Sequence, residues 1–290
     1  MIQRGYQMKT KLVLLTLTLL FSNCQESDKL DSSPEPVFFT GDTLIQVNDI
    51  IMFVEAYGSG DAVVLLHGCL GDNSTWDGVI DSFSADYFTI MPESRGQGRT
   101  TDSDSSITYH RMAEDAIKLL DLLNIESATF VGFSDGANTA LDIAIHHGDR
   151  ANAIVAYAGN TSPNKLQSSF RMFLESATLA SLQANGMITS NYIHSMPDPD
   201  RIEIIIEKLR TMLLTEPNFT AAELASVEVP VLVLAGENDE YIVSGHPAEI
   251  SAAIPGSQLV LLSNAGHNAI FETPVAWMGA VLTFLRDYPS

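Results

Sequence analysis

Three residues far apart in the chain have the types and settings of a nucleophile, a base and an acid. Ser134 stands in Gly-x-Ser-x-Gly, directly after a short apolar run. A hydroxyl is a weak nucleophile and needs a neighbouring base that a third group orients. His267, in Asn-Ala-Gly-His-Asn, is the candidate base, and Asp239, in Gly-Glu-Asn-Asp-Glu, is the candidate acid.

The motif around Ser134 predicts a sharp turn from a strand into a helix, which holds the hydroxyl clear of the backbone. Such a turn strains the backbone of the serine. Gly132 and Gly136 are then required, because no Cβ fits where the arms of the turn approach each other. Since the motif is short and its residues are common, it also fits an ordinary strand-loop-helix connection, and the rest of the chain must decide.

His267 and Asp239 each follow a predicted strand. The carboxyl ends of parallel strands open at one edge of a sheet, so both loops should meet the serine turn there. The chain order of serine, acid and histidine is the order expected for this architecture. Glu237 and Glu240 remain rival acids beside Asp239.

A fourth element, His67-Gly68-Cys69, follows the apolar run 62–66. Acyl transfer develops negative charge on a carbonyl oxygen, which two backbone N–H groups can stabilise. We expect these amides to belong to Cys69 and to Asp135, the residue after the nucleophile. His67 is interpreted as a structural histidine that orders this loop. Cys69 is disfavoured as a rival nucleophile, because no turn of the Ser134 type surrounds it.

Strand and helix patterns alternate along most of the chain, which predicts a mostly parallel sheet with helices on both faces. The expected strands are 51–57, 62–66, 87–91, the run before Ser134, 153–158, 229–235 and 258–262. The expected helices are 74–83, one over 112–123, one after Ser134 and a closing helix that runs to Leu285, with Thr273 as its N-cap and Pro274 in its first turn.

Residues from 163 to about 226 interrupt this alternation and predict a helical cap insertion over the sheet. Apolar residues recur at helical spacing in 170–177 and again in 202–213. Asp200 and Thr220 are each followed three residues later by a glutamate, which predicts a capping box at the start of a helix.

The N-terminus predicts export. Two lysines precede the apolar run Leu12–Phe21, which has the length of a signal peptide, and Cys24 follows. This resembles a bacterial lipoprotein signal, although Phe21 and Asn23 depart from the usual pattern, and an ordinary cleaved signal remains the alternative. The resemblance implies a signal peptide over 1–23 and a lipidated Cys24, and Gln25 at the next position favours an address at the outer membrane. The polar, proline-containing segment that follows predicts a flexible tether over 24–40. The globular domain is predicted over 41–290.

Composition narrows the classes of partner. The 290 residues carry a net charge of −21 and include 46% hydrophobic residues, enough for one large core. Such an acidic chain lacks the basic patches of nucleic-acid-binding proteins and is unsuited to electrostatic docking on anionic lipid. With Cys24 lipidated, Cys69 has no cysteine left to pair with.

From about Ile51 onward the sequence resembles the α/β-hydrolases that carry a helical cap. The resemblance rests on His67-Gly68, the segment 94–99 (Ser-Arg-Gly-Gln-Gly-Arg), the serine turn, Gly236-x-x-Asp239 and Gly266-His267. It implies a serine hydrolase of the Ser134, His267 and Asp239 type that forms an acyl-enzyme from a small carboxylic ester, lactone or thioester. It implies no metal or organic cofactor, and it does not indicate the oligomeric state.

Three alternatives remain open. Carbon–carbon bond hydrolases and cofactor-free perhydrolases of this family use a similar serine site, and a catalytically silent, surface-anchored binding protein is the third. The Ser-Asp pair Ser134-Asp135 resembles the turn of the valacyclovir hydrolases, in which the aspartate receives the ammonium of an amino-acid ester. Asp135 is therefore either a favourable charge at a helix N-terminus or a partner for a cationic substrate.

Overall fold

The computed structural model describes residues 36–288, which build one eight-stranded sheet. The strand order is β1-β2-β4-β3-β5-β6-β7-β8. Only β2 runs against its neighbours β1 and β4, and all other pairs are parallel. The strands are β1 (Gly41–Val47), β2 (Ile50–Tyr57), β3 (Ala62–Leu66), β4 (Phe88–Pro92), β5 (Ala128–Phe133), β6 (Ala151–Tyr157), β7 (Val231–Gly236) and β8 (Gln258–Leu262). The expected mostly parallel sheet is confirmed.

Strand β1 was not anticipated from the sequence. It forms a hairpin with β2 through the two-residue turn Asn48-Asp49, in which Asn48 has a positive φ of 47°. A sheet edge with one exposed face carries few consecutive apolar residues, and side chains in β1 alternate between partly buried and exposed. Its sequence therefore lacks the continuous apolar signal of the central strands.

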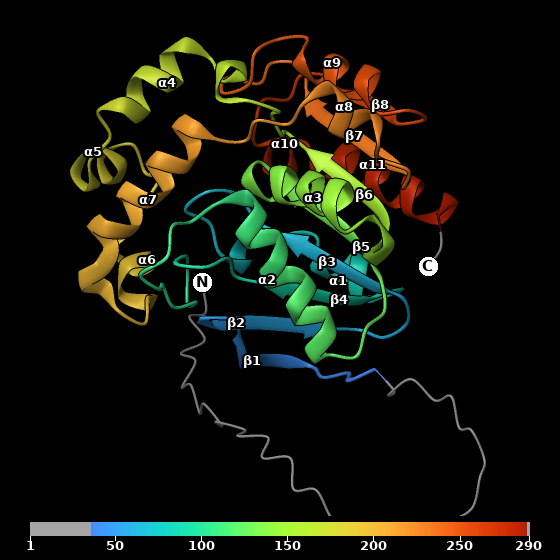
Figure 1. The fold of residues 1–290 in the computed structure, drawn as a ribbon, viewed down its shortest axis with the longest axis horizontal. Coiled ribbons are helices and arrows are strands. Elements are labelled where there is room, and N and C mark those ends of the chain that lie inside the picture. The colour runs from blue at the N-terminus through green and yellow to red at the C-terminus, as the bar shows by residue number, and fades with distance from the viewer. Residues whose placement is uncertain (1–35, 289–290) are drawn as a thin grey trace, which may run out of the picture.

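Helices cover both faces of the sheet (Figure 1). On one face α2 (Tyr109–Leu122), α3 (Asp135–His146) and α9 (His246–Ala253) pack on a large hydrophobic core. On the other face α1 (Ile80–Ser84) and α11 (Pro274–Asp287) enclose a second core. The short helix α10 (Ala269–Glu272) leads into α11.

Two helices differ in detail from the sequence-based expectation. The helix expected over 74–83 is a 3₁₀ turn, η1 (Asn73–Trp76), followed by the separate α1, because Asp77-Gly78 interrupts it. The closing helix begins at Pro274 as expected. However, the Thr273 hydroxyl donates to the Ala269 carbonyl of α10 at 3.2 Å instead of capping α11.

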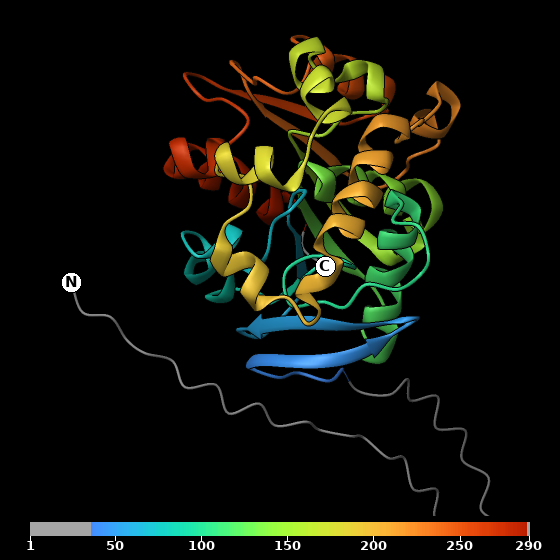
Figure 2. The same cartoon turned by 90° about the vertical axis from the view of Figure 1, so that its left-hand side faces the viewer.

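The cap follows β6 and precedes β7 in the chain. The helical cap insertion is therefore confirmed (Figures 1 and 2). Its elements are η3 (Pro163–Lys165), α4 (Ser168–Glu175), α5 (Leu179–Ala184), α6 (Ser190–Ser195), η4 (Pro199–Arg201), α7 (Ile202–Thr215) and α8 (Ala221–Ala225). The capping box of Thr220 with Glu223 is present. The box expected at Asp200 is wrong, because Asp200 lies inside the 3₁₀ turn η4 and α7 has no side-chain cap.

Polar contacts hold the cap to the loop that follows β4. The Gly98 amide donates to the Tyr192 hydroxyl of α6 at 3.0 Å. Arg201 and Lys208 both reach the Asp102 carboxylate, at 2.7 and 2.8 Å. An apolar cluster formed by α2, α5, α6 and α7 adds buried surface to these contacts. The cap is therefore anchored through the same loop that carries the family-like segment 94–99.

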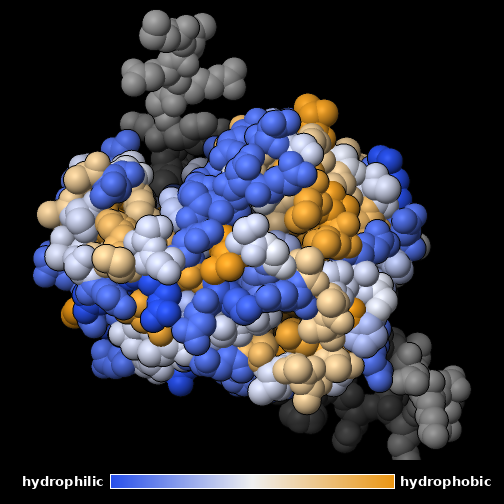
Figure 3. Space-filling model, turned by 90° about the horizontal axis from the view of Figure 1, so that it is seen from above, coloured by the Kyte–Doolittle hydropathy of each residue, from blue (hydrophilic) through white to orange (hydrophobic). Residues whose placement is uncertain are grey.

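Hydrophilic residues cover much of the face seen from above, with hydrophobic residues in groups between them (Figure 3). The most exposed large hydrophobic side chains include Met172, Phe271 and Val275. Among residues 36–288 no helix has the length and apolar character needed to cross a bilayer. The expected signal peptide, the lipidated Cys24 and most of the predicted tether lie outside the described residues.

Candidate active site

The turn around Ser134 has the strained geometry that its motif predicts. Ser134 ends β5 and precedes α3 with φ 54° and ψ −113°, a left-handed φ that residues other than glycine rarely adopt. A Cβ on Gly132 would collide with the Gly136 carbonyl, and one on Gly136 would collide with the Leu66 carbonyl of β3. Both glycines are therefore required by close backbone approach, as expected.

His267 lies between Ser134 and Asp239. Its Nε2 is 3.0 Å from the Ser134 hydroxyl, and its Nδ1 is 3.0 and 2.9 Å from the two carboxylate oxygens of Asp239. An ionised carboxylate only accepts, so Nδ1 carries the hydrogen and Nε2 is left to accept from the hydroxyl. The structure thus brings together three residues that are 28 and 133 positions apart in the chain.

The structure also separates Asp239 from its two rivals. Asp239 Oδ1 accepts from the backbone amides of Tyr241 and Ile242 at 2.8 and 2.9 Å, which fixes the carboxylate. Glu237 is exposed, and the Glu240 carboxylate accepts from the main-chain amide of His267 at 3.0 Å instead of from its ring. Asp239 is therefore the acid that meets the imidazole.

Aromatic side chains surround the imidazole of His267, which is 5% exposed. The rings of Phe133 and Tyr241 have centroids 5.3 and 4.8 Å from it. The Tyr157 hydroxyl donates to the main-chain carbonyl of His267. Sequence reasoning missed Tyr157 and Tyr241. Their positions in the sequence could have identified them, because Tyr157 ends β6 and Tyr241 stands two residues after Asp239.

His67 has the structural role expected of it. Its Nε2 accepts from the Ser94 amide at 3.0 Å, so its Nδ1 carries the hydrogen and donates to the Gly68 carbonyl at 2.8 Å. Burial lowers the pKa of His67 and so favours the neutral ring that this pattern requires. His67 therefore ties the loop after β3 to the loop after β4.

The two segments expected to supply the oxyanion amides lie beside the nucleophile. A Cβ on Gly68 would come 3.2 Å from the Ser134 Cβ, so the loop after β3 passes directly beside the nucleophile. Cys69 and Asp135 both line the cavity in front of Ser134. Burial raises the pKa of the Cys69 thiol well above its ordinary value, which makes it a poor nucleophile.

The Asp135 side chain is buried, at 3% exposure, and does not sit at a solvated helix end. Its Oδ1 accepts from the Tyr109 hydroxyl of α2 at 2.8 Å, while its Oδ2 has no hydrogen-bond partner within the described residues. Burial raises the pKa of Asp135 from 3.8 to about 6, although the Tyr109 hydroxyl and the Cys69 thiol beside its carboxylate oppose the rise. Sequence reasoning missed Tyr109, because Tyr109 precedes the helix expected over 112–123, whereas α2 begins at this residue.

A cavity of about 330 Å³ opens in front of Ser134, between the sheet edge and the cap. Loops of the sheet contribute one wall, and the cap contributes the apolar side chains Leu166, Phe170 and Leu213. Sites for small molecules have this size and mixed character. The cluster of His110, Asp142 and His146, which could hold a metal ion, is not part of this cavity.

Comparison with known proteins agrees with this architecture. The family model of the alpha/beta hydrolase fold matches residues 61–177. The 3-oxoadipate enol-lactonase 2 of Acinetobacter baylyi is 27% identical over 274 residues, which cover 87% of this chain and 99% of that protein. RutD of Caulobacter, provisionally named a carbamate hydrolase, is 24% identical over 246 residues, which cover 77% and 90%.

A solved structure shows the same fold. Carboxylesterase CesB from Bacillus subtilis superposes with a TM-score of 0.70 at 21% identity, over 86% of this chain and 92% of the esterase. The eight-stranded sheet, the helical cap and the family model therefore agree, and the chain has the α/β-hydrolase fold.

Proposed function

We propose that this hydrolase cleaves small carboxylic esters, including lactones and thioesters, by serine acyl transfer. The observation that carries the proposal is the position of His267, whose ring nitrogens meet the Ser134 hydroxyl at 3.0 Å and the Asp239 carboxylate at 2.9 Å. A hydroxyl, an imidazole and a carboxylate in this order form the constellation that activates serine.

The proposed reaction has two steps. His267 Nε2 accepts the Ser134 proton while Oγ attacks the ester carbonyl, and the imidazolium then protonates the departing alcohol. Asp239 stabilises the imidazolium, and the amides of Cys69 and Asp135 stabilise the oxyanion. Water, deprotonated by His267, then attacks the acyl-enzyme, and Ser134 recovers its proton as the carboxylic acid leaves.

The substrate class is inferred from the cavity and the relatives. A cavity of about 330 Å³ accommodates a small ester, and apolar cap residues form part of its lining. One curated relative is named an enol-lactonase and another is provisionally named a carbamate hydrolase, and both names imply attack on a carbonyl. Esters and lactones are the first substrates to test, with carbamates as a comparison.

The experiment is a substrate panel on wild-type protein and Ser134→Ala. p-Nitrophenyl esters of increasing chain length, lactones, carbamates and vinylogous diketones are compared, together with halogenation in the presence of peroxide. Serine-dependent ester or lactone turnover supports the proposal. Turnover of diketones alone, or peroxide-dependent halogenation alone, would assign the site to one of the other two reactions. A protein that turns over nothing and resists fluorophosphonate labelling of Ser134 would be a binding module.

A narrower substrate class is suggested by Asp135. Its unpartnered Oδ2 is buried and belongs to a residue that lines the cavity, so a substrate ammonium there would supply the missing partner. We propose α-amino-acid esters as a second candidate class. The test compares an amino-acid ester with its des-amino analogue in wild type and in Asp135→Asn. Equal rates on both esters in wild type would leave Asp135 without a role in substrate selection.

We also propose that the enzyme acts in the bacterial cell envelope, attached by lipid at Cys24. The support is the sequence alone, in which an apolar run precedes Cys24 and a polar segment follows. Lipidated protein should partition into detergent and lose its lipid in Cys24→Ser. Mass spectrometry that finds an unmodified mature protein starting at another residue would contradict this address.

A further inference from the structure

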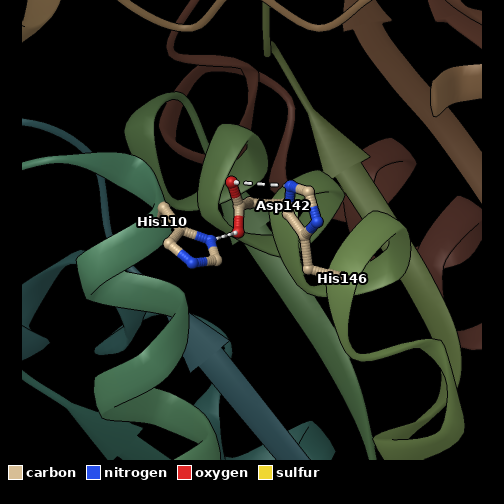
Figure 4. Close-up of side chains that lie close together, drawn as sticks. All are labelled: His110, Asp142 and His146. Carbon is tan, nitrogen blue, oxygen red and sulfur yellow. Dashed lines mark hydrogen bonds and ion pairs between the residues drawn. The ribbon is translucent and has the colours of Figure 1, made fainter.

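Two histidines converge on one buried carboxylate on the outer side of α2 and α3 (Figure 4). His110 is the second residue of α2, while Asp142 and His146 are four residues apart on α3 and so share one face of that helix. His110 Nδ1 is 2.9 Å from Asp142 Oδ1, and His146 Nε2 is 3.9 Å from Asp142 Oδ2.

The spacing of these atoms suits a small metal ion. One nitrogen from each histidine and one oxygen from Asp142 lie within 4.8 Å of one another. Zinc binds imidazole nitrogen and carboxylate oxygen at about 2.0–2.2 Å, so neighbouring ligands of a tetrahedral ion lie roughly 3.3 Å apart. The observed separations of 2.9 and 3.9 Å are to different oxygens of Asp142 and fall on either side of that value. Rotation of the carboxylate and the two imidazoles would bring both nitrogens to one ion.

The electrostatics of the cluster also favour a cation. The Asp142 side chain is 6% exposed, and the groups that face its carboxylate are imidazoles instead of a lysine or an arginine. Glu114 and Glu216 add negative charge beside His110. A divalent ion would balance the negative charge of this buried carboxylate.

We propose that His110, Asp142 and His146 form a binding site for Zn²⁺ or a similar borderline divalent ion, separate from the catalytic cavity. His110 and His146 are partly exposed, so an ion can reach the site and water can complete the coordination. The His147 ring stacks on His110 with planes 13° apart, which restricts the orientation of that ligand. A bound ion would join the start of α2 to the end of α3.

The test titrates ZnCl₂ into untagged, chelator-treated full-length protein by calorimetry, and into His110→Ala and His146→Ala. We expect one ion per chain for wild type and a loss of affinity of about tenfold or more in each variant. Zinc should raise the melting temperature of wild type more than that of either variant. With Cu²⁺ as a probe, electron paramagnetic resonance should show coupling to two imidazole nitrogens.

His194→Ala is the matched control, because His194 is an exposed histidine of the cap helix α6 and lies outside the cluster. It should bind zinc like wild type. Equal ester turnover by the His110 and His146 variants in metal-free buffer would show that they are folded. Failure of wild type to bind one zinc ion at micromolar concentrations would overturn the proposal, as would unchanged affinity in both variants.

Discussion

Near each end of α3, a histidine from another part of the chain meets an aspartate at 2.9 Å, yet the surroundings of the two pairs differ. Beyond the N-terminal end, His267 is buried and its second nitrogen meets the Ser134 hydroxyl. At the other end, the side chain of His110 is 52% exposed, and the carboxylate of Asp142 faces a second imidazole instead of a hydroxyl.

The difference shows that a histidine–carboxylate pair does not specify a function by itself. Where backbone amides fix the carboxylate and a hydroxyl is the third partner, the pair can move a proton to and from an oxygen nucleophile. Where solvent reaches the pair and a second imidazole is the third partner, the same groups can ligate a metal ion. The third partner and access to water therefore decide between the two functions.

Replacing the proposed nucleophile or its base should have the largest effect on turnover. Ser134→Ala and His267→Ala should each lower kcat by about 10³–10⁶, because the nucleophile and its base act as one unit. Steady-state kinetics on the best ester measures the loss. Zinc binding should be unchanged in both variants, since neither residue touches the second cluster. Near-normal turnover in Ser134→Ala would remove serine from the mechanism.

Removing the negative charge of Asp239 should have the second-largest effect on turnover. Asp239→Asn should lower kcat by about 10⁴, because an amide can hold the imidazole in the wrong tautomer and cannot stabilise its cation. Glu237→Gln is the control and should keep wild-type turnover, since Glu237 is exposed. The opposite result, with activity lost in the Glu237 variant and kept in the Asp239 variant, would reassign the acid.

Asp135→Asn should change stability with a definite pH dependence. The pKa of Asp135 is raised in the folded protein, so its contribution to stability is fully present below pH 4 and is lost as pH rises to about 6. A rise from 3.8 to about 6 corresponds to about 3 kcal/mol, by which the variant should exceed wild type in unfolding free energy at pH 7.

Urea unfolding of wild type and Asp135→Asn at pH 4 and pH 7 measures this difference. The exposed Asp149→Asn is the control and should match wild type at both pH values. A stability difference that does not change with pH would mean that the Asp135 carboxylate is better compensated than its unpartnered Oδ2 indicates.

The smallest effect is expected at the exposed cluster without metal. His146→Ala should change the unfolding free energy by at most about 1 kcal/mol, because its 3.9 Å contact with Asp142 is partly solvated. Chemical denaturation in the presence of a chelator measures it. A much larger loss would make His146 a structural partner of the buried carboxylate and would weaken the comparison between the two pairs.

The amino-acid sequence by itself determined the alternation of strands and helices, the position of the cap and the strained turn at Ser134. These features depend on local rules, namely hydrophobic periodicity and the steric demands of a tight turn. The same rules misjudged Asp200 and Thr273, where a 3₁₀ turn and a neighbouring helix took the place of the expected caps. Strand β1 was missed because its edge position leaves little apolar pattern.

Only the tertiary structure decided which acid meets His267, because Asp239 and its two glutamate rivals all carry a carboxylate and stand within four residues of one another, and they differ in where that carboxylate lies. It also decided that Asp135 is buried against Tyr109, and that His110 lies beside Asp142 and His146. Such contacts join segments 26 to 133 positions apart. Their distances follow from strand register and helix packing, which no single segment of the sequence encodes.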